Sequence, residues 1–222
     1  MTKEPTYGQL SAAIIAGNKQ ELLDTVEAAL KEGIAPSDII EKGMSPGMKE
    51  VGEQFSRYEI YLPEMMMAAE AWERGMKALE PKLLAAGVEH KKVGRVIIGT
   101  VSGDIHSIGK NIVGAMLKMN GFEVFDLGID VTASTFVIKA EEVDADIIAA
   151  SALMSTTMPQ QKNIIAHLEA RGIRDKYCFL VGGGSTSQEW ADSIGADGYG
   201  RTAGDAASLA LKAISQGKKE TS

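Results

Sequence analysis

The sequence is poor in the residues that most often build covalent or metal sites, because its 222 residues include one cysteine and three histidines. A single cysteine cannot form an intramolecular disulfide, and no CxxC pair is present to bind a metal or to exchange electrons. Cys178 lies in the apolar segment YCFLV. That segment predicts a buried strand and an inert thiol in the core.

Basic residues are also scarce, since 23 lysines and arginines stand against 30 acidic residues and give a net charge of -7. Nucleic-acid binding requires a basic patch that this sequence lacks, so we expect none. No apolar run is long enough to span a bilayer, and the first residues do not resemble a secretory leader. We therefore expect no membrane association and a cytoplasmic location.

The amino-terminal part of the chain, residues 1–88, has the periodicity of helices. Asn18 is a predicted N-cap, with Glu21 three residues later. Pro46 is expected to break or restart a helix, and Pro63 opens the longest predicted helix. Successive helices joined by short links predict a four-helix bundle that forms a first, cap-like domain.

Residues 89–222 have a different pattern, in which compact apolar segments alternate with amphipathic stretches of helical length. The segments are VGRVIIGTV, FEVFDLG, ADIIAAS, YCFLVGG and the short ADGYG. This alternation predicts an α/β domain with a doubly wound, Rossmann-type parallel sheet of five strands in the flavodoxin-like order. Ligands of such sheets bind beyond the carboxyl ends of the strands. The loops SGDIHSIG, SALMSTT, GGGSTS and GRTAG should therefore converge on one site.

The loop after the first predicted strand narrows the choice of ligand. Neither GxGxxG after that strand nor GxxxxGK[ST] anywhere is present, which argues against a nucleotide. Ser151 stands where a phosphorylated receiver domain needs an aspartate. Asp104 can accept a hydrogen bond from one ring nitrogen of His106 and leave the other nitrogen free for a metal. One imidazole cannot hold a bare ion, but it can be an axial ligand to a metal already held in a macrocycle.

Three short motifs follow the first, third and fourth predicted strands in the order D-x-H-x-x-G, S-x-L and G-G, and together they resemble the signature of cobalamin-binding domains. The preceding segment VGEQFSRYEIYLPEMMMAAEAW resembles the helical cap of cobalamin-dependent methyltransferases such as methionine synthase, and of corrinoid proteins of methanol, methylamine and demethylase systems. The resemblance extends from about residue 10 to residue 215. The motif residues are Asp104, His106, Gly109, Ser151, Leu153, Gly182 and Gly183.

The resemblance implies that cobalamin binds base-off, with its nucleotide tail in the sheet domain. His106 would be the axial ligand of the cobalt, and Asp104 would orient it. Gly109 would let a helix start close to the cofactor. The other expected cofactor contacts are Ser107 and Ile108 in the loop, Ser151 and Leu153 along the tail, Ser155 and Thr157 as hydroxyl donors, and Gly182 and Gly183 as space for the nucleotide.

Two residues of the predicted cap, Phe55 and Leu62, match apolar residues that cover the methyl face of the corrin in this family. One departure concerns Ser107, where many relatives have an acid. The polar network around Asp104 and His106 is therefore expected to differ in detail from theirs.

The implied function is that of a methyl carrier without catalytic activity of its own, which alternates between cob(I)alamin and methylcob(III)alamin. Its expected partners are a substrate-specific methyltransferase, a second methyltransferase that passes the methyl group to a thiol or folate acceptor, and a reductive activation protein. The segment SALMSTTMPQQK and the cap favour a methylamine-type system.

Three alternatives remain open on the sequence. The cobalamin-binding subunit of a mutase has the same sheet motif but lacks this cap. A cobalamin-sensing regulator would need a DNA-binding domain, for which the residues before the predicted bundle give no room. A flavin-binding flavodoxin-like protein would leave His106 unexplained.

Overall fold

The computed structural model describes residues 3–85 and 92–216 of the chain. The chain divides into two compact units, Met1–Lys91 and Lys92–Ser222. Within the two described ranges, no helix is both long enough and apolar enough to cross a membrane.

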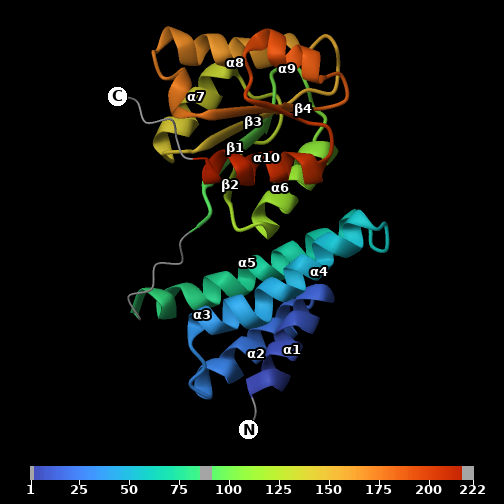
Figure 1. Cartoon of the computed structure of the whole chain (residues 1–222), viewed down its shortest axis with the longest axis vertical. Helices are drawn as coiled ribbons and strands as arrows, with labels where there is room; N and C mark the ends of the chain where they lie inside the picture. Colours follow the sequence, from blue (N-terminus) through green and yellow to red (C-terminus); the bar gives the residue numbers. More distant parts are fainter. Residues whose placement is uncertain (1–2, 86–91, 217–222) are drawn as a thin grey trace. The chain divides into compact units, whose positions relative to one another are not determined.

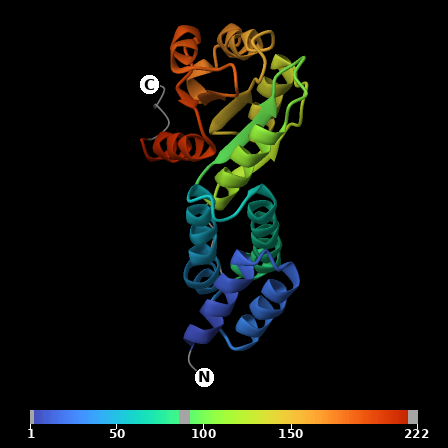
Figure 2. The ribbon, with the colours of Figure 1, turned by 90° about the vertical axis from the view of Figure 1, so that its right-hand side faces the viewer.

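The first unit is helical, as predicted, and its longer helices pack on one another (Figures 1 and 2). Helix α1 contacts α2, α4 and α5, and α2 and α4 each contact α5. The core between them is apolar and includes Leu10, Leu22 and Met65. The elements are α1 (Lys3–Ile15), α2 (Lys19–Lys31), α3 (Pro36–Asp38), the π-helix η1 (Ile39–Met44), α4 (Ser45–Ser56) and α5 (Leu62–Ala85).

Local signals in the sequence set several of these helix ends. The side-chain oxygen of Asn18 accepts a hydrogen bond from the backbone N–H of Glu21 at 3.2 Å, which confirms the predicted N-cap. The restart predicted at Pro46 is also confirmed, because the π-helix gives way to α4 one residue before that proline. Proline fits there because first-turn N–H groups have no partner within the helix.

The second unit holds a five-stranded sheet in which every neighbouring pair of strands is parallel. The strand order is β2-β1-β3-β4-β5, which confirms the predicted flavodoxin-like topology. Each strand coincides with one of the five apolar segments of the sequence. The strands are β1 (Arg95–Thr100), β2 (Glu123–Asp126), β3 (Ile147–Ser151), β4 (Cys178–Gly182) and β5 (Gly198–Gly200).

Helices cover both faces of the sheet (Figure 1). Helices α7 (Ala133–Glu142), α8 (Pro159–Ala170) and α9 (Gln188–Ile194) pack on one face, which we call the packed face. Helices α6 (Ile108–Met119) and α10 (Ala203–Ser215) contact each other and cover the other face, which we call the cavity face.

Cys178 begins β4 and packs beside the apolar cluster of the cavity face. Burial raises the pKa of its thiol to about 12, so the group stays protonated at neutral pH. Cys178 is half-buried at the edge of this cluster, so the prediction of a thiol within the core holds only in part.

Candidate functional site

The loop between β1 and α6 carries a histidine that is fixed through one ring nitrogen. His106 Nδ1 lies 2.7 Å from Asp104 Oδ1, and the backbone N–H of His106 donates to the same oxygen at 3.0 Å. The hydroxyl of Thr100 donates to the carbonyl of His106 at 2.8 Å. Because a carboxylate can only accept, Nδ1 is the donor, and a neutral imidazole with its proton on Nδ1 carries its lone pair on Nε2. The His106 side chain is 48% exposed, which suits a ligand role for that second nitrogen.

Asp104 is fully buried and ties two loops together. Its second carboxylate oxygen accepts hydrogen bonds from the Leu153 N–H at 2.8 Å and from the Thr157 hydroxyl at 2.7 Å, both in the loop between β3 and α8. Burial by itself raises the pKa of Asp104, but the hydrogen bonds from Thr157, His106 and Leu153 outweigh it and hold that pKa well below its usual value. The residue is therefore an anion that positions His106.

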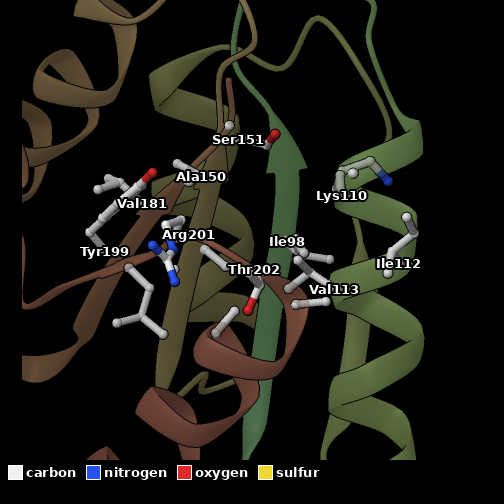
Figure 3. A pocket seen from close by; sticks show the side chains of 18 of the residues that line it. Ile98, Lys110, Ile112, Val113, Ala150, Ser151, Val181, Tyr199, Arg201 and Thr202 are labelled. Atoms are coloured by element: carbon white, nitrogen blue, oxygen red, sulfur yellow. The ribbon is translucent and has the colours of Figure 1, made fainter. Parts of the chain in front are cut away.

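A cavity of about 370 Å³ lies on the cavity face of the sheet, between α6 and α10. Its apolar walls include Ile98 and Ala149 from the strands and Val113 from α6, and His106 is part of its lining. Figure 3 shows α6 with Lys110, Ile112 and Val113 on one side of the cavity, and Tyr199, Arg201 and Thr202 on the other. The cavity therefore connects the histidine loop with the chain around the start of α10.

The predicted site residues fall into three groups around this cavity. Six of them line it, namely His106, Gly109, Ser151, Leu153, Gly182 and Gly183. Asp104 and Thr157 are buried behind His106, and Thr157 donates to Asp104 and to the Met154 carbonyl. Ser107 is the residue before α6, and Ile108 and Ser155 are exposed. None of these last five residues is among the lining residues.

Phe55 and Leu62, the two predicted cap residues, belong to the helical unit. Phe55 lies in the last turn of α4, Leu62 is the first residue of α5, and both side chains are half-buried. Their expected contact with a corrin ring stays a prediction.

Gly183 has a structural role that the sequence did not indicate. A Cβ atom at this position would lie 2.0 Å from the carbonyl oxygen of Ala152, and the backbone has a φ of +116°. The glycine is thus required for the close approach of the loop after β4 to the loop after β3. Gly183 also lines the cavity, and its expected role of leaving room for the nucleotide stays a prediction.

Sequence reasoning missed several residues of the site. Lys110 is 3% exposed and its ammonium group lies 2.6 Å from both carboxylate oxygens of Asp126, so a buried ion pair fixes the first turn of α6 to the end of β2. Gln161 is fully buried and donates to the carbonyls of Ala150 and Gly182, which joins β3 to β4. The lysine follows Gly109 directly, but nothing in the sequence pointed to its partner sixteen residues away.

Two family models match this chain and identify its family and its cofactor. Residues 94–208 match a family model described as a B12 binding domain, and residues 7–80 match a second model with the same description. The chain belongs to the B12-binding corrinoid proteins. Its cofactor is therefore cobalamin, as the sequence motifs predicted.

Relatives of this corrinoid protein match it over nearly their whole length. It is 47% identical over 207 residues to trimethylamine corrinoid protein 1 of Methanosarcina acetivorans, covering 93% of this chain and 96% of the relative. A corrinoid protein of Desulfitobacterium hafniense is 46% identical with the same coverage. Among solved structures, the methanol:cobalamin methyltransferase complex MtaBC from Methanosarcina barkeri superposes with a TM-score of 0.88 and 32% identity, covering 98% of this chain and 82% of that one.

The residues of the corrinoid protein fit cobalamin in two respects. Within the described ranges, no three His, Cys, Asp or Glu side chains come together to hold a metal ion, so a cobalt bound here has to arrive in its macrocycle. The cavity lining is mostly apolar, and the described part of the chain contributes no carboxylate to it. Such walls suit the apolar base and the phosphodiester of the cobalamin nucleotide tail.

Proposed function

We propose that this corrinoid protein is a methyl carrier that binds cobalamin base-off, with His106 in place of the lower base. The observation that carries the proposal is the geometry of His106, whose Nδ1 is held by the buried carboxylate of Asp104 while Nε2 remains available next to the cavity. An oriented imidazole with an anionic partner is a stronger metal ligand than a free one. When bound, cobalamin supplies a cobalt centre that accepts and gives up a methyl group by moving between Co(I) and Co(III).

The remaining site residues have supporting roles in this proposal. Asp104 fixes the ring of His106, and the hydrogen bonds from Leu153 and Thr157 fix Asp104. Ser151 and the glycines after β4 line the cavity that receives the nucleotide tail. Gly109, in the first turn of α6, has no atom within 4 Å of the place where a Cβ would stand, so it keeps the cavity wall open there.

An absorption spectrum tests this binding mode. The protein is incubated with hydroxocobalamin and desalted, and its visible spectrum is compared with those of His106→Ala and of His167→Ala, whose exposed histidine in α8 does not line the cavity. Wild type and His167→Ala should retain a corrinoid with the spectrum of a histidine-ligated, base-off form. Loss of this spectrum in His106→Ala alone supports the proposal, whereas an unchanged spectrum in that variant contradicts it.

We also propose that the carrier works between protein partners. A substrate-specific methyltransferase would load the methyl group, a second methyltransferase would pass it to a thiol or folate acceptor, and a reductive activation protein would restore Co(I). Support for the first partner comes from the similar structure of MtaBC, which is a complex of a methanol:cobalamin methyltransferase. The helical unit matches a B12-binding family model of its own. This match favours a methyl carrier over the cobalamin-binding subunit of a mutase, because that subunit lacks such a helical cap.

A methylamine is the proposed source of the methyl group. Support comes from relatives named as trimethylamine or dimethylamine corrinoid proteins, which are 43% to 47% identical to this chain over nearly its whole length. The test mixes the cobalamin-loaded carrier with purified methyltransferases specific for trimethylamine, dimethylamine, monomethylamine or methanol and measures the rate of cobalamin methylation. One of the amine enzymes should be fastest, and an equal or faster rate with the methanol enzyme would contradict the assignment.

A further inference from the structure

Arg201 is a cation of the cavity for which the fold provides no acidic partner among the described residues. It stands between the end of β5 and the start of α10, and it lines the cavity. Within the part of the chain that the structure describes, Arg201 has neither a hydrogen bond nor an ion pair. The neighbouring carboxylate of Asp205 accepts a hydrogen bond from the Thr202 N–H at 3.1 Å instead, which closes the capping box of α10.

Lys110 is the second cation among the described residues that line the cavity, and its charge is already neutralised. Lys110 is buried and makes an ion pair with Asp126 at 2.6 Å. Among the residues that the structure describes, no aspartate or glutamate lines the cavity, although the whole chain has a net charge of -7. An unpaired guanidinium therefore gives this cavity a local positive charge in an acidic protein, as an anionic ligand group requires.

The backbone around Arg201 holds it at the cavity. A Cβ atom at Gly200 would lie 2.8 Å from the Cβ of Ala206, so the end of β5 packs directly on the first turn of α10. Arg201 and Thr202 consequently lie on the α10 side of the cavity, opposite Val113 of α6 (Figure 3). The amino-terminal end of α10 lies next to the same residue, but the carboxylate of Asp205 already occupies its capping box, so the attraction for an anion rests on the guanidinium.

We propose that Arg201 binds the phosphodiester of the cobalamin nucleotide tail and so contributes to the choice of complete corrinoids over those without a tail. The phosphodiester is the one permanently charged group of the nucleotide tail, and a guanidinium can donate two hydrogen bonds to it. The apolar strand residues of the cavity would then contact the base of the tail. This inference rests on the proposed base-off binding, in which the tail occupies the cavity.

The test compares cobalamin with cobinamide, a corrinoid that lacks the nucleotide, its phosphodiester and the base. Dissociation constants for both are measured by absorbance titration for wild type, Arg201→Gln and Arg201→Lys. The matched control is Lys162→Gln, which removes an exposed cation of α8 outside the cavity. Loss of a charge-assisted hydrogen bond predicts a cobalamin affinity about tenfold lower in Arg201→Gln, partial recovery in Arg201→Lys, and no change in Lys162→Gln.

Cobinamide separates the possible outcomes. Unchanged cobinamide binding by Arg201→Gln, together with weaker cobalamin binding, supports the inference and shows that the variant is folded. Equal losses for both corrinoids, or no loss for cobalamin, overturn the role of Arg201 but leave the base-off proposal intact, provided that wild type prefers cobalamin. If wild type binds both corrinoids equally well, the tail does not occupy the cavity, and both proposals fail.

Discussion

The two faces of the sheet are built differently, although the same five strands supply both. Among the described residues, the buried apolar cluster of the packed face has nineteen members, and that of the cavity face has eight. Six of those eight also line the cavity, namely Val96, Ile98, Leu117, Ile147, Ala149 and Leu180. Since buried apolar area is the main source of stability, the packed face stabilises the domain, whereas the cavity face keeps the open interior in which we place the nucleotide tail.

Two adjacent isoleucines of β1 offer the strongest test of this comparison. Ile97 is fully buried on the packed face, and Ile98 is 2% exposed and lines the cavity. In the cofactor-free protein, Ile97→Ala should lower the free energy of unfolding by about 4 kcal/mol, because it opens a void in a packed core. Ile98→Ala should cost about 2 kcal/mol, since its side chain already faces an empty space. Urea denaturation of both variants gives the two values.

Cobalamin should reverse the order of these two variants. Ile98→Ala removes part of the wall of the cavity in which we place the nucleotide tail. It should therefore weaken cobalamin binding more than Ile97→Ala does, when both are titrated under conditions where they remain folded. Equal costs of unfolding together with equal affinities would show that the two faces do not divide stability and binding between them.

Asp104 joins the loop before α6, on the cavity face, to the loop before α8, on the packed face. Its substitution should have the next largest effect on the free energy of unfolding. One carboxylate oxygen accepts from His106, next to the cavity, and the other accepts from Leu153 and Thr157, before α8 of the packed face. In Asp104→Asn, an NH2 group replaces one of the two accepting oxygens. This group then faces the N–H or O–H donors on one of these sides and cannot accept from them. Leaving buried donors unpaired should cost about 3 kcal/mol of unfolding free energy. Asp104→Glu, which keeps the charge, is the control that separates charge from shape.

Wild type and Asp104→Asn should differ in unfolding free energy by an amount that depends on pH, because the pKa of Asp104 is lowered in the folded protein. An aspartate with a depressed pKa in the folded state stabilises the protein above its unfolded-state pKa of about 3.9, and this stabilisation is lost as the pH falls through the folded-state pKa. The gap between wild type and Asp104→Asn should therefore be constant from about pH 5 to pH 8 and shrink below about pH 4. A gap that narrows near neutral pH instead would show that Asp104 is not the group responsible.

The sheet and the histidine loop could be predicted from the sequence because their signals are local. Each strand is one apolar segment, and parallel connections place the loop after β1 and the loop after β3 at the same edge. Asp104 and His106 are only two residues apart in the chain, and this short spacing is enough to predict the hydrogen bond between their side chains.

The cavity itself could not be predicted, since it depends on how far apart the packing holds α6 and α10. The ion pair of Lys110 with Asp126 and the contacts of Gln161 with β3 and β4 likewise join residues that are distant in sequence. Thr157 was expected near the ligand, but its distance in sequence from Asp104 gave no sign that it would donate to that carboxylate.

Substitution of Gly183 should have a smaller effect on the free energy of unfolding. It tests the close approach of the loop after β4 to the loop after β3. Gly183→Ala would place a methyl group 2.0 Å from the Ala152 carbonyl oxygen at a φ of +116°, and we expect a loss of about 2 kcal/mol from strain and collision together. Gly172→Ala is the matched control, because Gly172 has a φ of +68° with nothing within 4 Å. Thermal unfolding of both variants should show a clearly larger loss for Gly183→Ala, and equal losses would remove the close approach as the reason for this glycine.

Gly109→Ala should have the smallest effect on folding and still weaken binding. Gly109 lies in the first turn of α6, and no atom stands within 4 Å of an added Cβ, so alanine should leave the stability of the cofactor-free protein unchanged or raise it by less than about 1 kcal/mol. The same methyl group would project at a residue that lines the cavity beside His106. Cobalamin affinity should therefore fall while the urea midpoint holds or rises. A variant that binds cobalamin as tightly as wild type would show that the cofactor does not approach the start of α6, and the cavity face would then contact its ligand mainly through the strands and α10.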